Sequence, residues 1–277
     1  MPNNRRLSIL LFFSIWTITL ADICPEKCTC KDFNNYASLL NFKQLTSLDL
    51  SNNQLNSLDF SALSDFSLPS LIKLVLDDNK LASITRQSFI IFPNVEEISV
   101  KHNGIFAIDW EAFRLFRLKR LYLGWNHLPT ISEHMLRFTP NLEMLDLSHN
   151  QISIAQSSSF FAAQHLKHID LSFNRIQRFF YDSFSPLFQE FLQLETLDLS
   201  YNNLSSIPWQ SNRKVCVGEL VQPVLETLNI SHCPKLRLIE ARAFAKLPLL
   251  QTTILANNPM LNFISPSAFK TFLRCLN

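Results

Sequence analysis

The sequence predicts an α/β repeat solenoid, a horseshoe with a concave parallel β-sheet and an irregular or short-helical convex side. Three observations support this prediction. The same apolar spacing around one asparagine recurs about every 24 residues, each unit contains the alternation of a short strand, and a single unit has no partner for its apolar face. Such a unit must stack on copies of itself, so we expect one continuous domain.

The unit that begins at Leu142 shows the pattern most clearly. With Leu142 as position one, leucine fills positions four and six, Asn150 fills position nine and Ile152 fills position eleven. Positions four and six alternate with polar residues, which predicts a short strand with one buried face. The amide of Asn150 has donors and an acceptor that can satisfy the backbone of a turn. We therefore predict that Asn150 is buried and bonded to neighbouring turns.

Nine such repeats cover residues 45–272. They begin at Leu45, Leu71, Val95, Leu118, Leu142, Leu166, Leu194, Leu225 and Leu250. Position nine is asparagine in every repeat except the eighth, where Cys233 is an allowed variant. Six phenylalanines each close a Ser-Phe or Ala-Phe element in the convex segments, and we expect them to stack as an apolar spine. They are Phe89, Phe113, Phe160, Phe184, Phe244 and Phe269.

Residues 1–21 have the features of a secretory signal peptide. Arg5 and Arg6 precede the apolar run 7–20, and the small residues needed for cleavage follow. The run is shorter than the roughly 20 residues of a membrane span, although a signal anchor remains the alternative. Without these two arginines, the 25 basic residues fall to 23 and balance the 23 acidic residues. This neutrality argues against nucleic acid or a polyanionic surface as the main partner.

The composition also argues against an enzyme. The only glycines are Gly104, Gly124 and Gly218, so neither a phosphate-binding loop nor a dinucleotide fingerprint can be built. There is no His-Glu-x-x-His pair and no Gly-x-Ser-x-Gly turn, and the seven histidines are scattered through the repeats. We expect no catalytic residues, no cofactor and no metal.

A cysteine cluster, Cys24, Cys28 and Cys30, directly follows the signal peptide. With the repeats, it makes the mature chain resemble the extracellular leucine-rich repeat family, including slit-like, chaoptin-like and Toll-like ectodomains. That resemblance implies an amino-terminal cap with a disulfide between Cys24 and Cys30. The family's fourth cysteine is missing, so Cys28 lacks its partner and residues 22–44 would form an abbreviated cap. A zinc site competes with the disulfide, but a signal peptide favours an oxidising compartment.

Two segments interrupt the period. Residues 208–218 lack the phenylalanine element and carry charge, so they form either a tolerated surface loop or a functional insertion. Cys216 in this segment can pair with Cys233, or Cys233 can be a buried thiol. Residues 273–277, which include Cys275, begin a tenth repeat and stop without a closing cap. We therefore interpret the chain as a fragment, whose longer product would reach a membrane only through an anchor beyond Asn277.

Equal positions of successive repeats should form columns across the concave sheet, because stacked strands lie about 4.8 Å apart. Position two alternates in sign and predicts a stabilising ladder of Glu96, Lys119, Glu143, Lys167 and Glu195. Position five places like charges side by side at Asp146, Asp170 and Asp198. Either water screens these aspartates or a cationic partner compensates them. Position eight is rich in rings: His102, Trp125, His149, Phe173, Tyr201 and His232.

The resemblance implies recognition of an extracellular protein in adhesion, matrix organisation or receptor signalling. The alternative is an innate-immune-type receptor ectodomain for a microbial or glycan ligand. Exposed rings are typical interface anchors, so we predict a protein-binding site on the concave face. Its residues are Tyr122, Trp125, His149, Phe173 and Tyr201. The competing interpretation is that these rings only stack on one another.

Two acceptor sequons predict N-glycosylation at Asn203 and Asn229, because a signal peptide precedes them. We expect the protein to be secreted or to lie on the extracellular side of the plasma membrane. A glycan at Asn229 would cover the eighth strand and shift any partner toward the amino-terminal repeats.

Overall fold

A computed structural model describes residues 44–59, 67–132, 134–155, 160, 162–177, 193–207, 224–244, 247 and 249–270. The predicted signal peptide and cysteine cap, with Cys24, Cys28 and Cys30, lie outside these residues. So do Phe184, Cys216 and the segment that contains Cys275. The domain boundaries at residues 21, 44 and 272 therefore remain predictions.

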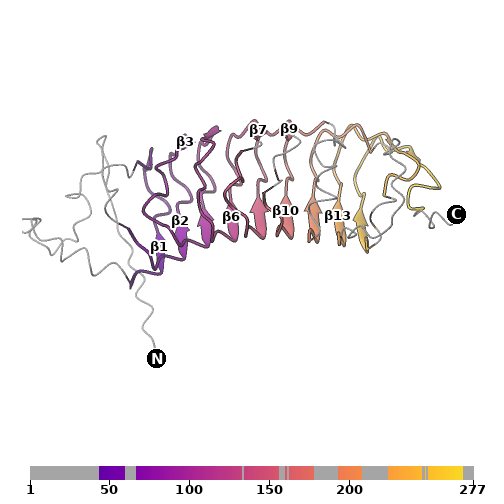
Figure 1. Ribbon diagram of the computed structural model, residues 1–277. Helices are drawn as coiled ribbons and strands as arrows, with labels where there is room; N and C mark the ends of the chain where they lie inside the picture. Colours follow the sequence, from indigo (N-terminus) through magenta and orange to yellow (C-terminus); the bar gives the residue numbers. More distant parts are fainter. Residues whose placement is uncertain are drawn as a thin grey trace, which may run out of the picture.

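Nine parallel strands form one sheet, and each occupies positions three to five of a repeat (Figure 1). They are β1 (Ser47–Asp49), β2 (Lys73–Val75), β4 (Glu97–Ser99), β6 (Arg120–Tyr122), β8 (Met144–Asp146), β10 (His168–Asp170), β11 (Thr196–Asp198), β13 (Thr227–Asn229) and β15 (Thr252–Ile254). Equal positions are in register from strand to strand, as for Leu121, Leu145 and Ile169. Identical positions of successive repeats therefore form columns on the concave face.

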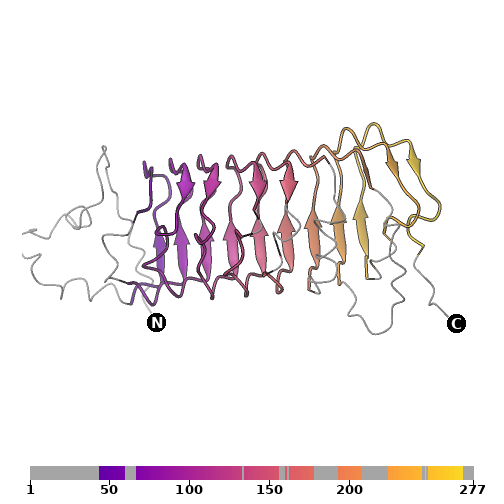
Figure 2. The same cartoon turned by 45° about the horizontal axis from the view of Figure 1, so that its top comes forward.

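The opposite side of the solenoid carries two-residue strands instead of helices (Figure 2). They are β3 (Ser83–Ile84), β5 (Ala107–Ile108), β7 (Thr130–Ile131), β9 (Ile154–Ala155), β12 (Ser206–Ile207), β14 (Leu238–Ile239) and β16 (Phe263–Ile264). No α-helix occurs in the described residues, so the short-helical option for the convex side and the α/β class are not confirmed, while the solenoid with its parallel sheet is. The reason is length. About 3.3 Å per extended residue lets a short segment cross the solenoid, whereas a helix advances only 1.5 Å per residue.

The core consists of positions one, four, six and eleven, as the spacing predicted. Leu118, Leu121 and Leu123 of the fourth repeat are all fully buried. The predicted phenylalanine spine is present in part. Phe89 stacks on Phe113 with ring centroids 5.6 Å apart, and Phe244 stacks on Phe269 at 4.8 Å.

Position nine forms a hydrogen-bonded ladder, and the prediction for Asn150 is confirmed. Asn150 is buried, and its Nδ2 donates to the carbonyls of Leu123, Leu147 and Ser148 at 3.0 to 3.1 Å. Its Oδ1 accepts from the Leu128 N–H at 3.0 Å. One side chain thus joins the fourth repeat to the fifth.

Cys233 occupies the same position in the eighth repeat as a free, buried thiol. Its Sγ lies 3.7 Å from the Leu199 carbonyl and 3.6 Å from the Ser231 carbonyl. Burial raises the pKa of this thiol. Of the two interpretations of Cys233, the structure therefore shows the buried thiol of the ladder.

Candidate functional site

Every residue at position eight has a left-handed backbone. The φ angles lie between 51° and 58°, from Asn52 in the first repeat to Asn257 in the ninth. Asparagine and aspartate tolerate this conformation, whereas other side chains pay roughly 1 to 2 kcal/mol. Six consecutive repeats nevertheless place a ring there, so another interaction must offset the strain.

That interaction is a continuous stack of six rings, called here the ring stack: His102, Trp125, His149, Phe173, Tyr201 and His232. Centroids of successive rings lie 4.9, 3.7, 4.0, 3.9 and 4.1 Å apart, with interplanar angles below 20°. At the far end, His232 Nε2 lies 2.9 Å from Asn257 Nδ2. The rings therefore stack across the strands, as the packing interpretation requires.

Stacking does not remove the rings from solvent. Trp125 is 49% exposed, Phe173 39% and Tyr201 41%. Because the ring faces contact each other, mainly ring edges are presented outward. Ring edges carry the positive end of the aromatic quadrupole, and Trp and Tyr add an N–H and an O–H group. The ring stack is thus a ridge suited to apolar groups and to hydrogen-bond acceptors.

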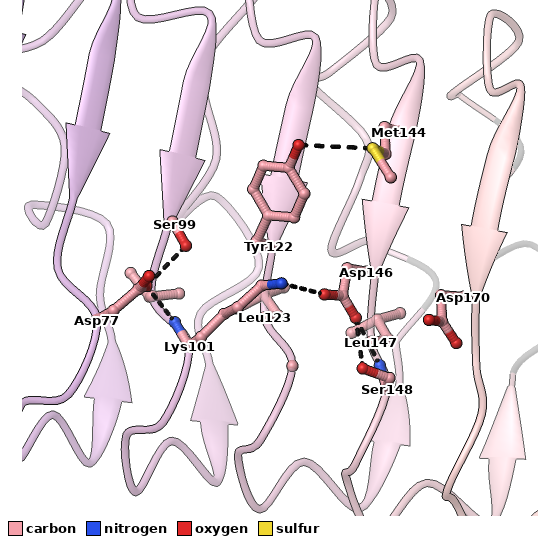
Figure 3. A network of polar contacts seen from close by, with 12 residues as sticks. Asp77, Ser99, Lys101, Tyr122, Leu123, Met144, Asp146, Leu147, Ser148 and Asp170 are labelled. Atoms are coloured by element: carbon pink, nitrogen blue, oxygen red, sulfur yellow. Dashed lines mark hydrogen bonds and ion pairs between the residues drawn. The ribbon is translucent and has the colours of Figure 1, made fainter. Parts of the chain in front are cut away.

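Tyr122 is not part of the ring stack and lies on β6, in the position-five column (Figure 3). Its O–H donates to Met144 Sδ at 3.5 Å. The Lys101 Nζ lies 4.8 Å from the centre of its ring. Of the five residues predicted to bind protein, four therefore belong to the ring stack, and Tyr122 contacts Met144 and Lys101 instead.

The three predicted aspartates pair in register on β8, β10 and β11, and we call them the aspartate column. Lys101 Nζ forms an ion pair with Asp146 at 2.7 Å (Figure 3). Burial would raise the pKa of Asp146, but hydrogen bonds from Lys101 and Ser148 outweigh it and lower the pKa. Part of the expected repulsion is thus compensated within the chain by Lys101, whereas the sequence predicted only screening by water or a cationic partner.

Asp170 lies between the other two carboxylates. It accepts the Ser172 N–H at 2.9 Å and has no ion pair with any described residue. Burial raises its pKa, and the charges of Asp146 and Asp198 add to this effect. Burial lowers the pKa of His149, while Asp170 and Asp146 act in the opposite direction. The aspartate column and the ring stack therefore lie close enough to interact.

The predicted position-two ladder is present at two places. Lys119 Nζ lies 2.9 Å from Glu96, and Lys167 Nζ lies 3.9 Å from Glu143. A second ladder at position three joins Glu97 to both Lys73 and Arg120 at 2.7 Å. Much of the charge on the amino-terminal half of the concave sheet is therefore neutralised locally.

Both predicted glycosylation residues are half-buried. Asn229 lies on β13, where its Nδ2 donates to Asp198 at 2.9 Å and its Oδ1 accepts the Ser231 N–H at 3.1 Å. A glycan on this amide would emerge over the concave sheet beside Asp198. Glycosylation at Asn203 and Asn229 remains a prediction.

No helix among the described residues is long and apolar enough to cross a membrane. Nor do the described residues include a group of three or more His, Cys, Asp or Glu side chains placed to hold a metal ion.

Solved structures share the fold at low sequence identity. FLRT2 in its octameric complex with Latrophilin 3 and Unc5D gives a TM-score of 0.65 at 22% identity, over 84% of this chain and 66% of that chain. TLR13 in its ssRNA13 complex gives 0.59 at 24% identity, over 78% and 33%. The Drosophila Toll–Spatzle complex gives 0.52 at 23% identity, over 70% and 29%. The chain thus spans about a third of the length of the TLR13 and Toll chains.

The TLR13 structure contains RNA, so these comparisons do not support the expectation that nucleic acid is excluded. No curated protein matches the chain. Leucine-rich repeat family profiles match residues 43–105, 93–152, 162–177 and 193–212, which together make up more than half of the sequence. With the nine-stranded solenoid and its asparagine ladder, these matches show that the chain belongs to the leucine-rich repeat family.

Proposed function

We propose that this chain is an extracellular protein-binding module of adhesion, matrix organisation or receptor recognition. Its partner docks on the concave face of repeats four to seven, with Trp125 as the anchor and Tyr122, His149, Phe173 and Tyr201 around it. The observation that carries the proposal is the ring stack, which is ordered by packing and is still exposed along its edge. A solenoid of stacked repeats is a binding scaffold, and we assign no catalytic role.

The ring stack is favourable for binding because its rings are already held in place. Each interior ring is fixed by neighbours on both faces, so docking a partner orders few additional side chains. Aromatic residues at the centre of an interface also contribute most to affinity. The uncompensated charge of Asp170 beside the stack favours a partner that places a cation there, and such an interface weakens with added salt.

The test compares two tryptophans of equal exposure. Trp125 and Trp110 are each 49% exposed, but Trp110 lies outside the concave face and stacks on Arg86. For a partner recovered from extracellular fluid with the wild-type chain, Trp125→Ala should weaken binding by on the order of 2 kcal/mol. Trp110→Ala should leave the affinity unchanged.

Stacking requires a stability control, because truncation of Trp125 also removes two ring contacts. Trp125→Phe keeps a ring in the stack while removing the indole N–H, so it should melt close to the wild type and bind with intermediate affinity. If Trp125→Ala lowers the melting temperature while affinity holds, the ring stack is packing only and the proposal is rejected.

A receptor ectodomain for a microbial or glycan ligand is the second candidate, and the Toll and TLR13 folds are its only support. No described side chain favours it over the first.

A further inference from the structure

A balanced net charge conceals one local excess of arginine. Between residues 112 and 142 the chain carries Arg114, Arg117, Lys119, Arg120 and Arg137, with Glu133 as the only acid. The side chain of Glu133 lies outside the described residues. This excess falls in repeat four and in the convex segments on either side of it.

The structure divides these cations into two groups. Lys119 and Arg120 belong to the concave ladders and pair with Glu96 and Glu97 at 2.9 and 2.7 Å. Arg114, Arg117 and Arg137 are exposed and have no carboxylate partner among the described residues. These three guanidinium groups, in the convex segments on either side of repeat four, are therefore without a compensating carboxylate among the described residues.

Phe138 and Phe116 connect the two convex segments that carry these arginines. Arg114 and Arg137 place their Cζ atoms 5.4 and 5.7 Å from the centre of the Phe138 ring. Phe116, which is 55% exposed, meets Phe138 edge-on at 6.3 Å. The Asn141 Nδ2 donates to the Phe116 carbonyl at 2.7 Å and joins the two repeats. We call Arg114, Phe116, Arg117, Arg137 and Phe138 the rim patch.

The rim patch is separate from the ring stack. Phe116 and Arg117 come just before Leu118, at the amino-terminal end of the concave strand, whereas position eight follows its carboxy-terminal end. The two surfaces therefore lie at opposite ends of the same strands. A ligand of the rim patch does not depend on the protein partner proposed above.

We propose that the rim patch binds a linear sulfated polysaccharide. Two like charges share one ring here with no acid beside them in the part of the chain that the structure describes, so an oxyanion between them would relieve their repulsion. The guanidinium fork suits oxyanions that accept two hydrogen bonds. The patch contains five residues, far fewer than the roughly 20 to 30 that a folded partner contacts. A chain with charges spaced along its length fits such a narrow site, and the exposed Phe116 ring can pack on an apolar sugar face.

The experiment measures retention of the full chain on an immobilised heparin oligosaccharide as salt is raised. The test variant is Arg114→Gln, Arg117→Gln, Arg137→Gln. The control variant, Lys80→Gln, Lys235→Gln, Arg237→Gln, removes the same charge from exposed residues that have no carboxylate partner among the described ones. The test variant should bind heparin on the order of tenfold more weakly. Its binding should also depend less on salt, because a protein with fewer arginines releases fewer counterions from the polysaccharide when it binds. The control should stay within about twofold.

Melting curves of both variants show whether either has a folding defect. If the triple arginine variant does not fold, single arginine substitutions are tested in its place. Equal losses in the test and control variants would attribute retention to net charge and overturn the proposal. The proposal would also be overturned if the wild-type chain were not retained on heparin, or if fully desulfated heparin retained it as strongly as heparin. Tighter binding to a polyglutamate peptide or to single-stranded RNA of matched charge would assign the rim patch to another class of anion.

Discussion

At the scale of single residues, Gly124 leaves room for the Asp146 carboxylate, which Lys101 reaches from two repeats away. Lys101, Gly124 and Ser148 occupy position seven of repeats three, four and five. A Cβ on Gly124 would lie only 3.1 and 3.2 Å from the Asp146 carboxylate oxygens. Without that atom, the carboxylate lies beside the glycine and accepts the Lys101 ammonium (Figure 3). A glycine inside the repeat therefore serves the electrostatics of the concave face.

Lys101→Met should raise the pKa of Asp146, because burial then lacks its main opposing interaction. In the wild type the folded-state pKa is below the unfolded value. The resulting stability is therefore present above the unfolded pKa of about 3.9 and lost as pH falls through the folded value. We expect the variant to be less stable at pH 7 by about 1 kcal/mol, with the difference shrinking below pH 4.

Urea denaturation at pH 7 and at pH 3 measures this difference. Lys80→Met is the control, since Lys80 is exposed and has no acidic partner among the described residues. A loss of stability for Lys101→Met that is the same at both pH values would show that the lysine acts by packing and not by charge.

At the scale of elements, the sequence predicted the buried positions and the turn asparagines, which recur in every repeat. It did not predict the backbone conformation of the convex segments or of position eight. Positions four, six and nine were predicted correctly because their apolar or amide character recurs in every repeat. The two-residue convex strands were not predicted, because no recurring residue pattern marks them and the sequence left both an irregular and a short-helical convex side open. The left-handed turn at position eight was missed as well, because bulky rings such as Trp125 disfavour it and only stacking across repeats offsets the cost.

The ladder makes each repeat depend on its neighbour, so Asn150→Leu should destabilise more than one repeat. The substitution leaves the Leu128 N–H without its partner inside the core, and the Leu123 carbonyl keeps only the hydrogen bond from Asn126. Unpaired buried groups of this kind cost about 1 to 3 kcal/mol each. We expect a lower melting temperature and faster amide hydrogen exchange in repeats four and five.

Asn141→Leu is the matched control for this prediction. Asn141 is exposed and makes one bond, to the Phe116 carbonyl at 2.7 Å. Its loss should cost about 1 kcal/mol or less. A melting curve for Asn150→Leu that matches the wild type would show that the ladder bond at Asn150 adds no stability.

At the scale of the whole molecule, composition was the weakest guide to the surface. The predicted mature chain has 23 basic and 23 acidic residues. This balance averages over concave ladders that are neutralised, an aspartate column that is partly compensated and a rim patch with no carboxylate partner among the described residues. Pairing of side chains across repeats decides which charges remain available to a partner. Such pairing depends on registers and rotamers that composition does not contain, so Lys101 and the rim patch became visible only in the structure.

The last prediction concerns export of the chain. In a eukaryotic secretory host, we expect protein in the medium whose mass falls on N-glycosidase treatment, because residues 1–21 direct export and both sequons are read in the same compartment. Ser205→Ala and Ser231→Ala each destroy one sequon while keeping the asparagine amide, so each should remove one glycan. Ser231→Ala leaves the Asn229 bond to Asp198 in place, which separates loss of the glycan from loss of that contact. Unmodified protein confined to the cytosol would contradict both the signal peptide and the glycosylation sites.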